Sequence, residues 1–329
     1  MSANSFQPIN SSLSKIYLET SFINQFAQTR NWSDARATKG FQRIKGNIFT
    51  ISPVTIFELL QIKNELQREG LIVICQNLFY ERCLPSPEEL IIRHISLGCP
   101  KTEPIFELPS TNQFALTWEK IVLNTKTTFV YDPKTLQTQK TYLYYLFKAI
   151  RSFVKRNRIP KIYTFETHTK HTETDIGDIF SKFNINADQH SIEQVFIYIF
   201  ALAIVCGEIG IDPLPIQKYW SGLGIHGLEN RFAHLLENVP QCLSYGPLAS
   251  VGIMASVQAV KSPNAGAMFD CLHSVYIPYS NWFYVSDSGF LSFREAIDPR
   301  ISFRIRHFNE LAWTTHSRDI YTEGDGLYL

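Results

Sequence analysis

The chain has 329 residues, of which 45% are apolar and 13% aromatic, so it can bury a substantial hydrophobic core. A formal net charge of +1 excludes a strongly basic or acidic surface overall, so a nucleic acid would have to meet a local patch. Six cysteines without a C-x-x-C pair exclude a zinc ribbon and favour reduced thiols in a cytoplasmic protein. The N-terminus has no secretory signal, and the most apolar window, 195–206, is too short to span a bilayer, so no membrane association is expected.

The first organised segment places an acid at a strand-to-helix turn. Residues 15–18 form a short β-prone run. Glu19 follows directly, and the hydroxyls of Thr20 and Ser21 can cap a helix over 22–28. We therefore expect Glu19 at the carboxyl end of a strand.

A second strand-to-helix unit follows at 48–66. Residues 48–51 indicate a strand, and Ser52 followed by Pro53 is a typical helix start. Apolar residues at helical spacing predict that this helix, which contains Glu58, continues to residue 66 and is terminated by a glycine at position 70. The apolar run 71–75 then predicts a fully buried strand of a parallel sheet.

The middle of the chain, residues 76–263, is predicted to be mainly helical. Residues 192–206 form a buried helix, and 248–260 a helix rich in small residues. One predicted helix carries four basic residues at spacings of three and four, which indicates either a track for phosphates or a solvated basic face. These residues are Lys148, Arg151, Lys155 and Arg158.

Other groupings in the chain do not favour a functional site. His168 and His171, with a glutamate at 173, have the residue types of a metal site, but the spacing and the neighbouring threonines favour a polar loop. The glycines at 222–227 lack the preceding strand of a dinucleotide-binding loop and predict a turn. Cys271 lies on an apolar side, which argues against a thiol nucleophile.

The stretch 269–287 near the C-terminus carries two further acids. Asp270 opens a short apolar helix that Pro278 breaks, and residues 282–285 predict a buried strand that ends before Asp287. Because ligands bind at the carboxyl ends of strands in open α/β sheets, Asp287 is placed like Glu19. We therefore ask whether these acids and Glu58 share one site.

Four segments, in this order, resemble the motifs of PIN-domain nucleases. Residues 17–23 resemble the opening strand and acidic turn, and 52–60 the following helix start with its internal glutamate. Residues 270–287 resemble the closing motif of the larger PIN-like proteins, in which a helix with a histidine ends in a Pro-Tyr turn. Residues 303–311 resemble the last strand and the helix after it.

The resemblance implies an α/β fold: a PIN-like central parallel sheet with helices on both faces and a large, mainly helical insertion. One domain would span 1–329, formed by about 15–75 and 264–312, with 76–263 as the insertion. It implies a metal-dependent hydrolase, most often an endoribonuclease, in which Glu19, Glu58, Asp270 and Asp287 hold Mg²⁺ or Mn²⁺. Thr20, Ser21 and Ser286 would support these acids by hydrogen bonds, and Lys148, Arg151, Lys155 and Arg158 would bind nucleic acid.

The sequence leaves alternatives open. Glu19 stands where the family usually has Asp, and Ser280-Asn281 where larger members often have an acid. A catalytically degenerate fold that acts as an RNA- or protein-binding scaffold is therefore the second hypothesis. The expected substrate is RNA, with single-stranded DNA as its alternative. An inhibitory or scaffold protein partner and self-association as a homo-oligomer also remain open.

Overall fold

The computed structural model describes residues 15–29, 48–79, 84–100, 139–141, 143–144, 147, 161–165, 171–175, 192–207, 209–261, 266–296, 302–307 and 310. The four basic residues predicted to bind nucleic acid lie outside the described residues; they are Lys148, Arg151, Lys155 and Arg158. His168 lies outside them as well.

A four-stranded parallel sheet forms the centre of the fold, in the order β2-β1-β5-β6. Its strands are β1 (Lys15–Leu18), β2 (Ile48–Thr50), β5 (Trp282–Val285) and β6 (Ile305–His307). Central strand β1 pairs with β2 through Ile16 and Phe49, and with β5 through Tyr17 and Phe283. The strands predicted at 15–18, 48–51 and 282–285 are thereby confirmed.

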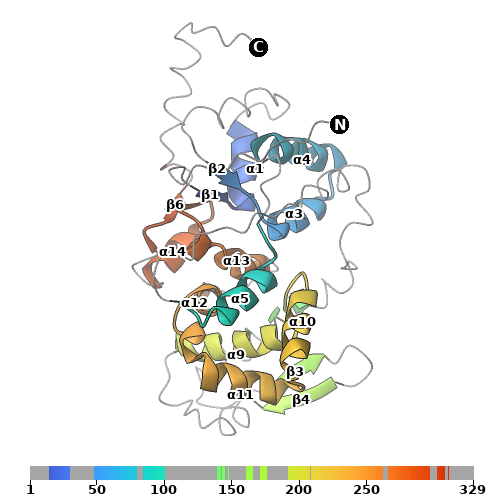
Figure 1. The fold of residues 1–329 in the computed structure, drawn as a ribbon. Coiled ribbons are helices and arrows are strands. Elements are labelled where there is room, and N and C mark those ends of the chain that lie inside the picture. The colour runs from blue at the N-terminus through green and yellow to red at the C-terminus, as the bar shows by residue number, and fades with distance from the viewer. Residues whose placement is uncertain are drawn as a thin grey trace, which may run out of the picture.

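Helices cover both faces of this sheet (Figure 1). On one face lie α1 (Thr20–Thr29) and α4 (Glu65–Phe79); on the other lie α13 (Ala267–Ser274) and α14 (Ser288–Ala296). The α/β fold class with a parallel sheet and helices on both faces is therefore confirmed.

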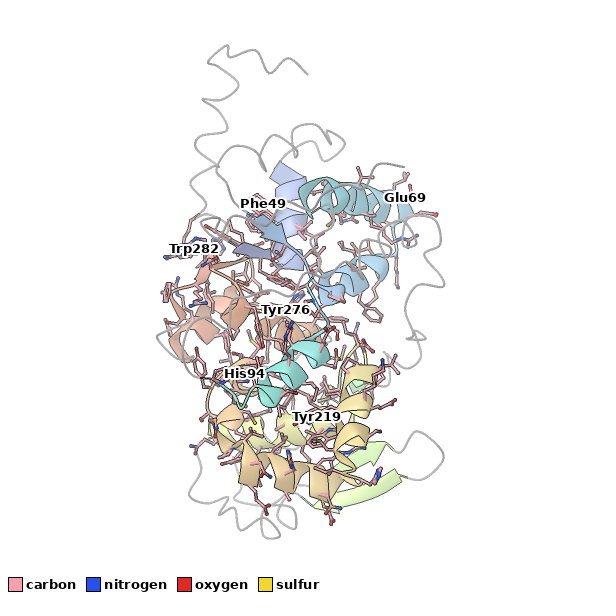
Figure 2. The ribbon with its side chains drawn as sticks, viewed as in Figure 1. Phe49, Glu69, His94, Tyr219, Tyr276 and Trp282 are labelled. Atoms are coloured by element: carbon pink, nitrogen blue, oxygen red, sulfur yellow. The ribbon has the colours of Figure 1, made fainter. Side chains whose placement is uncertain are left out.

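The side chains of the strands alternate between these two faces, as the pleat of a strand requires. Ile16 and Leu18 pack into the core beneath α1 and α4. Tyr17 points to the opposite face, where its ring stacks on Tyr276 at 4.9 Å and on Phe283 at 4.8 Å between centroids. Tyr276 lies in the middle of the molecule, between the sheet and the helices below it (Figure 2).

A helical block extends from the second face of the sheet (Figure 1). It comprises α5 (Pro87–Ser96), α9 (Ile192–Cys206), α10 (Leu214–Leu223), α11 (Leu228–Asn238), the 3-10 turn η2 (Pro240–Leu243) and α12 (Pro247–Lys261). Its buried side chains belong to the same hydrophobic core as Tyr17 and Phe283, so sheet and block are packed as one unit. The helices predicted at 192–206 and 248–260 are confirmed, whereas the exact domain boundaries stay a prediction.

The predicted long helix over 54–66 is two helices. The first, α3 (Pro53–Leu60), begins as predicted, with Pro53 in its first turn and the Ser52 side chain accepting from Thr55 N at 3.3 Å. Helix α3 ends at Leu60, and α4 starts separately at Glu65, where the Asn64 side chain accepts from Gln67 N at 3.0 Å and caps the new helix. Leu66, predicted on the apolar face, is 73% exposed.

The predicted strand at 71–75 is wrong, since these residues lie within α4. Helix α4 passes through Gly70, which was expected to terminate the preceding helix. Leu71, Ile72 and Cys75 pack against the sheet while Val73 is 40% exposed. A short apolar run cannot by itself distinguish a strand from the buried side of a helix, and here the helix is formed.

The polar loop predicted around His171 is also wrong in part. Residues His171–Asp175 form strand β4, which pairs antiparallel with β3 (Lys161–Phe165) in a separate two-stranded sheet.

The glycine turn is as expected: Gly224 ends α10 with φ of +67°, a left-handed conformation that favours glycine. Within the described part of the chain, no helix combines the length and apolar character needed to cross a bilayer.

Candidate metal centre

The carboxyl ends of three neighbouring strands meet at one edge of the sheet. Glu19 follows β1, Ser52 follows β2 and starts the helix that carries Glu58, and Asp287 follows β5. Helix α13, which carries Asp270 and His273, packs against α3 at this edge. Chain segments from both ends of the sequence therefore contribute polar side chains to one place, as open α/β sheets commonly arrange their binding sites.

Glu19, Glu58 and His273 form the compact part of this site. Each offers one ligand atom, and these three atoms lie within 4.8 Å of one another. His273 Nε2 is 2.8 Å from Glu58 Oε2 and 3.8 Å from Glu19 Oε1. Glu19 is 4% exposed and His273 is fully buried, whereas the Glu58 side chain is 20% exposed and connects the group to the surface.

Hydroxyl and amide donors hold the two glutamates in place. Ser21 donates from its backbone N at 2.9 Å and from its hydroxyl to Glu19 Oε2. Ser286 N in turn donates to Ser21 Oγ at 3.1 Å, which ties the turn after β1 to the turn after β5. The Thr20 hydroxyl donates to Glu58 Oε2. These contacts are of the kind expected for residues that support metal ligands.

Tyr17 orients His273 from the protein interior. Its hydroxyl lies 2.5 Å from His273 Nδ1 and 2.7 Å from Ser52 Oγ. A hydroxyl can donate or accept, so Tyr17 can satisfy either tautomer of the imidazole. With the proton on Nδ1, the Nε2 lone pair faces Glu58 and Glu19 and is available to a cation.

Asp270 and Asp287 border this group. Asp270 Oδ2 accepts from Gln258 Nε2 of α12, and Asp287 Oδ1 accepts from Gly289 N at the start of α14. The charges of Glu19, Glu58 and Asp287 all act on Asp270. The structure thus brings the four predicted acids into one electrostatic cluster, with Glu19 and Glu58 in its compact part and Asp270 and Asp287 beside it.

Burial and mutual repulsion oppose ionisation in this cluster. Burial raises the pKa of Glu19 to about 7, and the Glu58 charge adds to the rise, while His273 and the Ser21 hydrogen bonds oppose it. Burial likewise raises the pKa of Asp270, with further contributions from Glu19, Glu58 and Asp287. A bound cation would remove this penalty, because it compensates the charges that the fold forces together.

The donor set fits a divalent cation. Two carboxylates and an imidazole are ordinary ligands of Mn²⁺, Fe²⁺ and Zn²⁺, with bonds of about 2.0–2.2 Å. Ligand atoms no more than 4.8 Å apart can approach one ion after small side-chain shifts. The group could therefore hold a metal ion, and Asp270 and Asp287 lie beside it as further oxygen donors.

Two residues of the site were not assigned a role from the sequence. His273 was part of the quoted motif only; its position three residues after Asp270 on a predicted helix is the signal that could have identified it. Lys140 lies over the Phe269 ring at 4.9 Å and donates to Gln61 Oε1 at 2.7 Å. Burial lowers the pKa of Lys140 and the Glu58 charge opposes that change, so Lys140 lies near Glu58.

Searches of known protein-family models, of curated proteins and of solved structures found no match. Fold and site together define an α/β domain with a four-stranded parallel sheet and a buried acidic and histidine cluster.

Replacing Tyr17 by Phe is expected to lower divalent-metal affinity by about tenfold, because His273 loses the partner that orients its ring. Leaving buried polar groups unpaired should also lower the free energy of unfolding by about 1–3 kcal/mol. Isothermal titration calorimetry with Mn²⁺ and urea denaturation measure the two effects.

Tyr276→Phe is the matched control for this change. It removes one buried hydroxyl, which donates to Pro85 O at 2.9 Å, without touching His273. This control should lose stability but keep its metal affinity. Equal affinities in the Tyr17 variant and the wild type would show that Tyr17 does not support the metal centre.

Proposed function

We propose that this protein is a divalent-metal-dependent nuclease that cleaves phosphodiester bonds, and specifically an endoribonuclease of PIN-like architecture. The observation that carries the proposal is the buried group of Glu19, Glu58 and His273, flanked by Asp270 and Asp287, at the carboxyl edge of a parallel sheet. Acid clusters of this kind serve phosphoryl transfer because they hold cations against a substrate that is itself anionic. The order of the sequence motifs supports the PIN-like assignment.

The side chains of the site have separate tasks in this proposal. Glu19, Glu58 and His273 bind the cation, and Asp270 and Asp287 complete its surroundings or hold a second one. A bound divalent cation lowers the pKa of water and neutralises charge on the transferring phosphoryl group. Tyr17, Ser21 and Thr20 keep the ligands in place through the hydrogen bonds described above.

Lys140 supplies the positive charge for the substrate. It stands next to Glu58 and Phe269, at the partly exposed side of the cluster. An ammonium group at this position can pair with a non-bridging phosphate oxygen of the RNA backbone. The basic residues Lys148, Arg151, Lys155 and Arg158 follow within the same part of the sequence and would extend the contact along the strand.

The histidine ligand favours Mn²⁺ over Mg²⁺. Mg²⁺ prefers oxygen ligands and keeps several waters, whereas imidazole suits first-row transition metals. We therefore propose Mn²⁺ as the more effective cofactor, with Mg²⁺ able to bind through the carboxylates alone.

Cleavage of a fluorescently labelled single-stranded RNA tests this function. We expect cleavage with Mn²⁺, slower cleavage with Mg²⁺ and none in EDTA. Glu58→Gln should reduce the rate by roughly 100-fold, because it removes a charged ligand at the open side of the site. Single-stranded DNA of the same sequence, assayed in parallel, decides between the two substrate classes.

Glu65→Gln serves as the control because Glu65 is exposed on α4, where it makes a long ion pair of 3.9 Å with Arg68. It should cleave like the wild type. Cleavage that persists in EDTA, or that is equal in the Glu58 and Glu65 variants, would contradict the proposal.

The second candidate is a degenerate fold that binds RNA or protein without turnover. One observation favours it: Asp287 already caps α14 through Gly289 N, a structural use that does not require a metal. This candidate predicts binding of labelled RNA without cleavage under any divalent cation, and loss of binding when Arg151 and Lys155 are both changed to Glu.

A further inference from the structure

A second cluster of reactive side chains lies in the helical block, away from the metal centre. It consists of His94 and Cys99, at the end of α5, and Cys242 in η2. His94 is labelled in Figure 2, on the helical side of the molecule. Two contacts hold these segments together: Gln241 Nε2 donates to Gly98 O at 3.3 Å, and the His94 ring packs directly on Gly246.

The backbone positions Cys99 in an unusual way. After α5 ends, Cys99 N donates to His94 O at 2.9 Å, and Cys99 adopts φ of +52°. This left-handed conformation favours glycine and is uncommon for a residue with a side chain. It turns the Cys99 side chain inward, where it interacts with Cys242 and His94, while the preceding residues Leu97 and Gly98 are exposed.

His94 is a buried base whose ring nitrogens lack a regular hydrogen-bond partner among the described residues. It is 2% exposed, and neither ring nitrogen makes a full hydrogen bond among the described residues. The neighbouring Cys99 thiol is the group that interacts with this ring. A buried imidazole in this state is available to accept the proton of the neighbouring thiol.

The two thiols differ in their readiness to ionise. A hydrogen bond from Cys242, helped by His94, lowers the pKa of Cys99 to about 6. The same hydrogen bond, together with burial, raises the pKa of Cys242. Cys99 is therefore the thiol of the pair that ionises more readily, and Cys242 the one that keeps its proton.

We propose that Cys99 and Cys242 form a peroxide-reactive thiol pair that closes to a disulfide. The Cys99 thiol gives its proton to His94, and the thiolate attacks one oxygen of hydrogen peroxide. The O–O bond breaks, and the leaving hydroxide takes the proton from His94 as water. Cys242 then attacks the sulfenic sulfur of Cys99; the S–O bond breaks and a second water leaves with the Cys242 proton.

A disulfide suits this cluster better than a soft metal ion. Cys99 interacts with both other residues of the cluster. The three ligand atoms of this cluster do not all lie within 4.8 Å of one another, whereas those of Glu19, Glu58 and His273 do. A metal ion would need three convergent donors, while a disulfide needs only the two sulfurs.

Treatment of the reduced, folded protein with equimolar hydrogen peroxide tests the proposal. We expect a mass loss of about 2 Da and a peptide pair cross-linked through Cys99 and Cys242 in mass spectrometry. In Cys242→Ser the reaction should stop at the sulfenic acid, which dimedone traps on Cys99. His94→Asn should slow the first step by about tenfold or more.

Cys75 and Cys271 are internal controls in the same molecule. Both are buried thiols whose pKa is raised by burial, so they should remain unmodified over the same period. Oxidation of Cys99 no faster than of Cys75, or the absence of the cross-linked peptide, would overturn the proposal. So would Zn²⁺ that co-purifies in equimolar amount and protects both thiols. None of these readouts depends on nuclease activity.

Discussion

Replacing Asp270 by Asn should reduce metal-dependent RNA cleavage by roughly 100-fold or more and, at the same time, make the metal-free protein more stable. Asp270 lies beside Glu19, Glu58 and Asp287, and burial with their charges raises its pKa. At neutral pH the native state must keep either a buried charge or a proton that the unfolded chain would release. An amide avoids both costs, so the free energy of unfolding should rise by about 1–2 kcal/mol.

The two effects of this change are measured separately. Cleavage assays with Mn²⁺ give the loss of activity, and urea denaturation in EDTA gives the gain in stability. The Asn side chain can still accept from Gln258 Nε2, so the local packing is kept. Glu237→Gln, an exposed position on α11, is the control and should change neither quantity. Lower stability together with unchanged cleavage would contradict the assignment of Asp270 to the site.

The second large effect concerns pH and metal together. Without metal, the protein should become less stable as the pH rises from about 5 to 8. Glu19 has a native pKa of about 7 against an ordinary value of 4.5, so between these values the native state binds more protons than the unfolded chain. Stability is therefore favoured at the lower pH and is lost as the pH rises through 7.

Mn²⁺ should remove the part of this slope that Glu19 causes. The cation takes the place of the proton, so its stabilising effect should grow with pH, reaching about 2.7 kcal/mol at a hundredfold excess over Kd. Glu88, buried at the start of α5, also has a pKa raised by burial to about 7. Because Glu88 accepts from Ile211 N, away from the centre, its part of the slope should persist with Mn²⁺.

Urea denaturation at several pH values, with EDTA or Mn²⁺, measures these slopes. Glu19→Gln should flatten the metal-free slope and abolish the response to Mn²⁺, whereas Glu88→Gln should flatten the slope and leave that response intact. Identical slopes with and without Mn²⁺ in the wild type would show that Glu19 is not part of a metal centre.

Local chemistry explains what could be predicted from the sequence. Ser52 and Pro53 start α3 as expected because capping and a fixed proline φ act within one turn of helix. The strand ending before Glu19 and the one ending before Asp287 could be predicted for a similar reason: short β-prone runs are followed directly by polar residues.

Tertiary contacts determine the features of the fold and of the site that the sequence did not predict. The run 71–75 is helical because α4 packs one apolar side on α1 and β2 and leaves Val73 exposed. Five consecutive apolar residues do not by themselves indicate whether they form a strand or the buried side of a helix. The role of His273 in the site depends on its contacts with Tyr17 and Glu58, which are remote from it in sequence. Sequence alone could name four acids, but only the fold shows that Glu19 and Glu58 share a histidine.

Because β1 lies between β2 and β5, the central sheet can be assembled only after β5 has been synthesised. Tyr17 and His273 are separated by 256 residues, and β1 must wait for β5 to cover its second edge. At about 5–20 residues per second, the ribosome takes roughly 13–50 seconds to bridge that interval. Until then the nascent chain carries an unpaired strand edge and only Glu19 and Glu58 of the candidate cation site, so N-terminal fragments should aggregate readily and bind no metal there.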